Sequence, residues 1–112
     1  MKKTASLIIA VTSALALQGC ATSAAGLSKG KVDESYSSAK APSAVATCVV
    51  ETLVGDPVLR NEGDHYWIIR NNGYGMPAVR WDFLPKAGGG TAIELRSAIG
   101  INNGSDKVRS CI

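Results

Sequence analysis

The chain contains a single histidine, His65, which is the first candidate for acid–base chemistry near neutral pH. Asp64 precedes it, but neighbouring residues on a strand point to opposite faces of a sheet, so this carboxylate would not orient the imidazole ring. The serines lie mostly in the N-terminal part of the chain, and no strand–turn–helix pattern marks one of them as a nucleophile. We therefore expect His65 to be an ordinary strand or surface residue and the protein not to be an enzyme.

Two carboxylates, Asp82 and Glu94, could share one face of a sheet at a separation similar to that of the paired acids of glycosidases. Arg80 and Arg96 alternate with them along the same segments. Guanidinium groups beside both carboxylates would favour their ionised forms, whereas a glycosidase needs one of them protonated. Solvent-exposed ion pairs, each contributing less than about 1 kcal/mol, are therefore the preferred interpretation.

Phosphate and metal chemistry are not indicated. The segment 88–90 is Gly-Gly-Gly without the Lys-Ser/Thr of a phosphate-binding loop, and it fits a hairpin connection. Asn102, Asn103 and Asp106 offer oxygen atoms, but the glycine and glutamate of a calcium-binding loop are missing. One histidine and no Cys-x-x-Cys spacing provide no zinc ligand set. We expect no metal and no cofactor.

The first nineteen residues have the features of an export signal. Lys2 and Lys3 precede an uncharged, largely apolar stretch from Thr4 to Leu17. A helix of that length spans about 21 Å, which is short of the ~30 Å hydrocarbon core of a bilayer. We therefore predict a cleaved signal peptide over residues 1–19 rather than a transmembrane helix.

The segment Leu17-Gln18-Gly19-Cys20 resembles the lipobox of bacterial lipoproteins, although Gln18 departs from the small residue usual at its position. The resemblance implies that cleavage exposes Cys20 and that this residue carries the acyl chains, which together anchor a protein stably. The next residue is Ala21 rather than Asp, which by resemblance to the enterobacterial sorting pattern implies the outer membrane. An ordinary signal peptide cleaved nearby is the alternative.

Lipidation of one cysteine would leave Cys48 and Cys111 as a pair. The periplasm permits a disulfide between them. Closing a loop of about 64 residues would contribute roughly 4 kcal/mol in the chain-entropy model. Two free buried thiols are the alternative.

Charge and composition define the organisation of the remaining chain. Without the two signal lysines it has ten basic and nine acidic side chains, so no basic excess would attract nucleic acid. Residues 21–40 are rich in Ala, Ser, Gly and Lys and lack apolar periodicity, which is typical of a flexible tether. We predict a lipidated cysteine and tether over residues 20–40 and one small domain over residues 41–112.

Within that domain the apolar spacing predicts a helix from Pro42 to about Val54, with Cys48 on its buried face. Strands are expected at 58–61, 65–70, 78–84 and 91–99, with turns at 62–64, 71–73 and 85–90. Asn72-Gly73 indicates a type I′ hairpin turn. Residues 105–111 favour a short closing helix, with a terminal strand as the alternative. The expected fold is α+β: one helix packed on a three- or four-stranded antiparallel sheet, a short C-terminal helix and one disulfide.

Alternation within the last two long strands defines a buried face. The inward residues are expected to be Val79, Trp81, Phe83, Ile93, Leu95 and Ser97. The candidate recognition residues are Tyr66, Trp67 and Tyr74. If Tyr66 or Trp67 were exposed beside Tyr74, the rings would form a surface for a peptide, a glycan strand or a protein; ordinary core packing is the alternative.

From the helix onward the chain resembles a group of small, uncharacterised proteobacterial lipoproteins, through its central Cys48, Asn72-Gly73, the triple glycine and Cys111. The resemblance implies no activity. We expect a non-enzymatic module held by its lipid at the periplasmic face of the outer membrane, where it binds an envelope protein or peptidoglycan. The second hypothesis is a periplasmic inhibitor that blocks a hydrolase, such as a cell-wall-degrading enzyme, with a loop such as 71–76.

Overall fold

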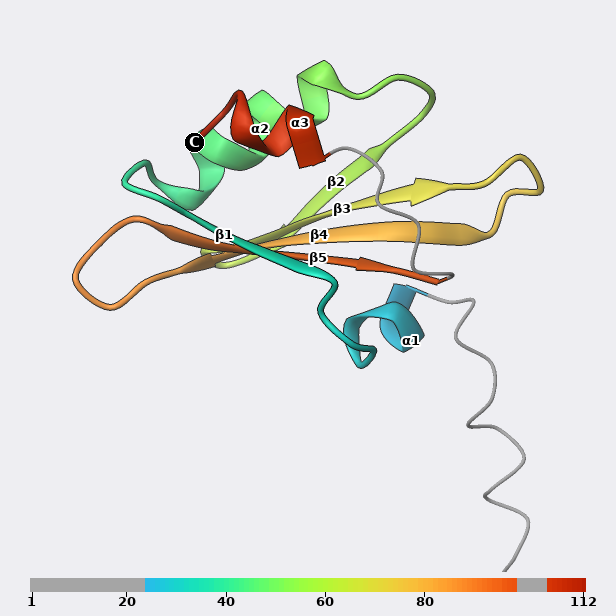
Figure 1. Ribbon diagram of the computed structural model, residues 1–112, viewed down its shortest axis with the longest axis horizontal. Helices are drawn as coiled ribbons and strands as arrows, with labels where there is room; N and C mark the ends of the chain where they lie inside the picture. Colours follow the sequence, from blue (N-terminus) through green and yellow to red (C-terminus); the bar gives the residue numbers. More distant parts are fainter. Residues whose placement is uncertain (1–23, 99–104) are drawn as a thin grey trace, which may run out of the picture.

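The computed structural model describes residues 24–98 and 105–112, which form one five-stranded antiparallel sheet and three short helices (Figure 1). The elements are α1 (Ala24–Ser28), β1 (Glu34–Ser38), α2 (Pro42–Thr52), β2 (Val58–Glu62), β3 (His65–Asn71), β4 (Pro77–Pro85), β5 (Thr91–Ser97) and α3 (Ser105–Arg109). The strand order is β1-β5-β4-β3-β2, so β2 to β5 form a meander and β1 is added at the far edge. The α+β class is confirmed, with five strands instead of three or four.

Helix α2 carries the chain from one edge of the sheet to the other. It begins at Pro42, as predicted, and ends two residues before the predicted Val54. Together with α3 it covers one face of the sheet, while α1 lies on the opposite face (Figure 1). None of the helices within residues 24–98 and 105–112 has the length and apolar character needed to cross a membrane.

The tether predicted over residues 20–40 is wrong from Ala24 onward, because α1 and β1 belong to the folded domain. Strand β1 pairs with β5 along its whole length, and Tyr36 packs against the core. The Asp33 carboxylate accepts hydrogen bonds from the backbone N–H and the hydroxyl of Ser97, both at 2.8 Å. The domain therefore starts well before the predicted residue 41.

The core lies between the sheet and α2, as the alternation predicted. Its largest fully buried side chains from the sheet are Trp81, Phe83, Ile68, Ile93 and Leu95. From α2 come Val45, Ala46 and Val49. Burying a large apolar side chain contributes about 1.5–3 kcal/mol, so this face supplies most of the stabilisation that a domain of this size can obtain.

The disulfide between Cys48 and Cys111 is confirmed, with 5.8 Å between the two Cα atoms. It joins the middle of α2 to the chain just after α3, and α3 is a helix rather than the alternative strand. The Lys40 ammonium group donates to the carbonyl oxygen of Cys111 at 3.2 Å. The C-terminus is thus fixed to the helical layer.

The β3–β4 hairpin is present, but its turn differs from the predicted type I′. Gly75, not Gly73, has the positive φ, at 79°. The Asn72 N–H donates to the Met76 carbonyl at 2.8 Å, and the Gly75 N–H donates to the Asn72 carbonyl at 3.1 Å. This is a three-residue connection with glycine at its left-handed position.

Candidate functional site

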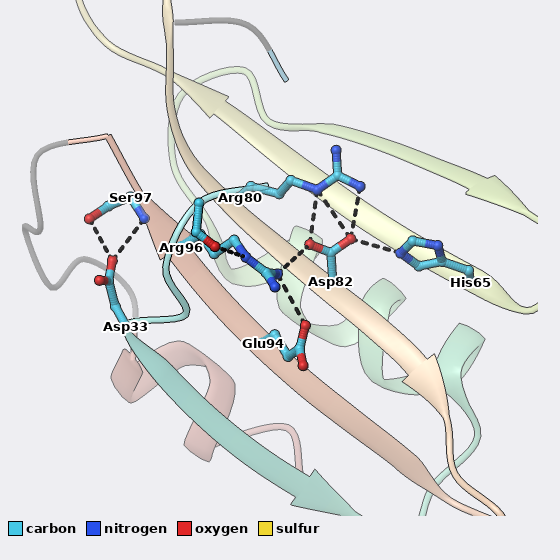
Figure 2. Close-up of polar contacts among 8 residues, drawn as sticks. Asp33, His65, Arg80, Asp82, Glu94, Arg96 and Ser97 are labelled. Carbon is cyan, nitrogen blue, oxygen red and sulfur yellow. Dashed lines mark hydrogen bonds and ion pairs between the residues drawn. The ribbon is translucent and has the colours of Figure 1, made fainter. Parts of the chain in front are cut away.

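Charged side chains meet on the sheet face opposite α2, and we call them the charged cluster (Figure 2). Its members are His65 from β3, Arg80 and Asp82 from β4, and Glu94 and Arg96 from β5. They share this face because Asp82 is aligned with Glu94, and Arg80 with Arg96. The predicted grouping of the two carboxylates and two guanidinium groups is therefore confirmed.

Asp82 is the centre of the charged cluster. Its Oδ1 lies 2.8 Å from Arg80 Nη2 and 2.7 Å from His65 Nε2. Its Oδ2 accepts from Arg80 Nε at 2.9 Å and from Arg96 Nη1 at 3.3 Å. Arg96 also pairs with Glu94, at 3.1 Å. One carboxylate thus links three strands of the sheet.

The central pair of this cluster is buried, so the prediction that Arg80 and Asp82 face solvent is wrong. Their exposed fractions are 7% and 3%. Helix α1 packs against β4 and β5 on this face and buries its own Leu27 there. The ring of Trp67 lies 5.1 Å from the Arg80 guanidinium carbon. Helix α1 and Trp67 therefore shield Arg80 and Asp82 from the solvent that the prediction assumed.

The pairing of His65 with Asp82 was not predicted, because the two residues lie 17 positions apart on different strands. Trp67 is aligned with Asp82, so His65, two residues earlier on the same face, lies diagonal to that carboxylate. In a catalytic triad, a carboxylate orients the histidine imidazole in this way. Within the described residues, however, His65 has no hydrogen bond to a serine, threonine or cysteine. The arrangement ties β3 to β4 and lacks a nucleophile in these ranges.

The predicted aromatic surface does not form. Tyr66 is half-buried and packs against the core on the α2 side. Trp67 points to the opposite face, where it is half-buried against Arg80 and the His65 ring. Tyr74 is 91% exposed and lies in the β3–β4 hairpin turn. The three candidate residues therefore occupy separate places, and Tyr74 alone is fully available to a partner.

A cleft beside this turn was not predicted from the sequence. It lies between the α2–β2 connection and the β3–β4 hairpin, and both are at the end of the sheet opposite the β4–β5 hairpin (Figure 1). We call it the loop-end cleft; its volume is about 400 Å³. It is lined by Val54, Gly55, Asp56, Arg70, Asn71, Asn72, Gly73 and Gly75.

Exposed apolar side chains gather at the same end. Val54 is 70% exposed, and Val58, Tyr74 and Met76 are also exposed. The turn that carries the last two is held in shape by its own side chain: Asn72 Oδ1 accepts from the N–H groups of Tyr74, at 2.8 Å, and Met76, at 3.1 Å. These apolar groups are therefore presented on an ordered backbone.

The remaining residues considered for phosphate or metal binding lie in regular elements, in a turn or outside the described residues. Asp106 lies in the first turn of α3, and the triple glycine connects β4 to β5 as predicted. Cys20, Asn102 and Asn103 lie outside the described residues. Within the described ranges, no three His, Cys, Asp or Glu side chains are grouped so that they could hold a metal ion.

No family model, curated protein or solved structure matches this chain.

Proposed function

We propose that the protein is a lipid-anchored, non-enzymatic module of the bacterial envelope that binds a partner through its loop end. The proposed anchor is Cys20, within its lipobox-like segment, and Ala21 favours the periplasmic face of the outer membrane. The Cys48–Cys111 disulfide supports export, since such bonds persist in oxidising compartments.

The observation that carries the binding role is the concentration of exposed apolar side chains around the loop-end cleft. An ordered turn presents Tyr74 and Met76, and Val54 projects from the facing connection. Interaction sites are enriched in aromatic residues and methionine, and they require little ordering on binding when the backbone is already fixed. The charged cluster is a weaker candidate, because both oxygens of Asp82 already accept hydrogen bonds from within the cluster.

A second function, inhibition of a periplasmic hydrolase, is favoured by the shape of the same turn. A projecting loop with a fully exposed Tyr74 at its centre suits insertion into an enzyme cleft. The two hypotheses differ in the partner: a structural component of the envelope in the first, and a hydrolase whose activity falls in the second.

The anchor is tested with Cys20→Ser. We expect the wild-type protein to incorporate labelled palmitate and to sediment with membranes, and the variant to do neither. Unchanged sedimentation of the variant would refute the anchor and leave the binding role untouched.

The binding role is tested with a photoreactive amino acid at position 74 in intact cells. The matched control places the same group at Arg60, an exposed residue of the edge strand β2. We expect a specific crosslinked product from position 74 only. A hydrolase in that product, inhibited by wild type but not by Tyr74→Ala, would select the second hypothesis. Turnover of cell-wall fragments by the protein, lost in His65→Ala, would refute the non-enzymatic role.

A further inference from the structure

The side chain of Arg70 has an unusual environment. It is half-buried on the α2-facing side of β3, where its cross-strand neighbour is Val79. No described residue accepts a hydrogen bond from its guanidinium group or forms an ion pair with it. By contrast, Arg80 and Arg96 on the other face both bind carboxylates. Partial burial of a charged group without a partner is unfavourable, so Arg70 is suited to bind an anion from outside the domain.

Asp56 lines the same cleft from the α2–β2 connection. It is exposed, and it too forms no ion pair with Arg70 or with any other described residue. Two residues of opposite charge therefore line one cleft without an ion pair between them. A ligand that carries both a carboxylate and an ammonium group would satisfy them together.

The size and walls of the loop-end cleft suit a small ligand. Its volume of about 400 Å³ lies at the lower end of the range for small-molecule sites. Gly55 and Gly73 form part of the walls, and a Cβ atom added to either would meet no other atom within 4 Å. Glycine at these places leaves the adjacent backbone polar groups uncovered by a side chain.

From this arrangement we propose that the loop-end cleft binds an amino-acid unit, with its carboxylate on Arg70 and its ammonium group on Asp56. The planar guanidinium fork binds a carboxylate through two parallel hydrogen bonds. The inference rests on the binding role proposed above for the loop end, and it defines the chemistry of that partner: a free amino acid, or an amino-acid unit of a peptide that retains both charges.

The test is a titration of the full chain, purified in detergent micelles, followed by the amide NMR signals of the cleft glycines. The probes are alanine, acetate and ethylamine, which separate the zwitterion from each charge alone. We expect saturable shifts with alanine at a concentration about tenfold lower than with either single-charge probe, since a hydrogen bond to a charged group is worth about that factor. No saturation with alanine, or equal affinity for acetate, would overturn the proposal.

Variants locate the site. Arg70→Gln and Asp56→Asn should each weaken alanine binding about tenfold, the factor for one charge-assisted contact. Arg70→Lys should restore only part of the loss, because the fork is missing. Asp56 is exposed, so its variant remains informative if replacement of Arg70 disturbs folding. Arg60→Gln is the control and should bind as wild type; an equal loss there would refute the assignment.

The outcomes also separate this inference from the function it rests on. Crosslinking from position 74 without an alanine response would retain the partner and reject the amino-acid ligand. Alanine binding without any crosslinked product would retain the site and reject the macromolecular partner.

Discussion

Replacing Asp82 by alanine tests the internal role of the charged cluster. The change removes the carboxylate that binds the guanidinium groups of Arg80 and Arg96 and the imidazole of His65. Arg96 keeps its ion pair with Glu94, but Arg80 is only 7% exposed and loses its carboxylate partner. The main loss of stability should therefore come from the guanidinium charge of Arg80, which remains in a poorly hydrated site after losing this carboxylate.

Removing one member of a buried ion pair costs about 3–5 kcal/mol. For a domain of this size each kcal/mol corresponds to about 4–8 °C, so the midpoint of thermal unfolding should fall by about 12–40 °C. Circular dichroism during urea and thermal unfolding, with the disulfide intact, measures both quantities. The urea dependence should keep its slope, because the area exposed on unfolding hardly changes.

Glu94→Ala is the matched control, since Glu94 is aligned with Asp82 on the neighbouring strand. Its side chain is 34% exposed, and solvent screening should limit its effect to below about 1 kcal/mol. Changing both Arg80 and Asp82 to leucine should restore much of the stability lost in Asp82→Ala, because the buried guanidinium group that lost its carboxylate is then replaced by an apolar side chain. Equal losses for the two alanine variants, or a double variant less stable than Asp82→Ala, would refute this reasoning.

Three further changes have defined outcomes. Cys48 and Cys111 are 63 residues apart, so alanine at both positions should lower the free energy of unfolding by roughly 4 kcal/mol in the chain-entropy model. An unchanged urea midpoint would contradict this. Gly90→Ala should cost at least about 1 kcal/mol more than Gly88→Ala. Both glycines have positive φ, but a methyl group at Gly90 would also overlap the backbone carbonyl oxygen of Ser38 at the end of β1. Equal thermal midpoints would argue against that close approach. Partial burial, and then the hydrogen bond to the neighbouring glutamate, raise the pKa of Tyr36. The folded state therefore favours the neutral phenol, and its contribution to stability is present below the ordinary pKa of 10.0 and is lost as the pH rises through the raised pKa. Tyr36→Phe should therefore reduce the decrease in the unfolding midpoint at alkaline pH. An identical decrease in both proteins would exclude the effect.

Elements with strong apolar patterning were predictable from the sequence. The helix starting at Pro42 and the alternation of Val79, Trp81 and Phe83 are both present. The disulfide followed from counting cysteines, because only Cys48 and Cys111 were left once the lipobox cysteine was set aside. In each case the evidence was local in the sequence.

Elements that depend on a distant partner were missed. Strand β1 contains one large apolar residue, Tyr36, and it is a strand because β5 offers it an edge for hydrogen bonding. Helix α1 contributes the single buried Leu27. The burial of Arg80 and Asp82 was missed because α1 was predicted to be part of a tether. Without α1, no element covers this face of the sheet, and both side chains were expected to be exposed to solvent. The loop-end cleft was missed because it requires two connections to meet in space.

The position of α1 also bears on which partner the loop end can reach. Helix α1 begins four residues after Cys20, a distance that an extended chain covers in at most about 14 Å. Given the proposed lipid on Cys20, the start of α1 lies close to the bilayer, and the disulfide lies on the opposite face of the sheet from α1 (Figure 1). The α2–β2 connection that lines the loop-end cleft lies on the disulfide side of the sheet, so the cleft is on the side away from α1 (Figure 1). With α1 towards the bilayer, this side of the domain is accessible from the periplasm to an envelope protein, a cell-wall peptide or a hydrolase, and the crosslinking experiment at position 74 distinguishes these partners.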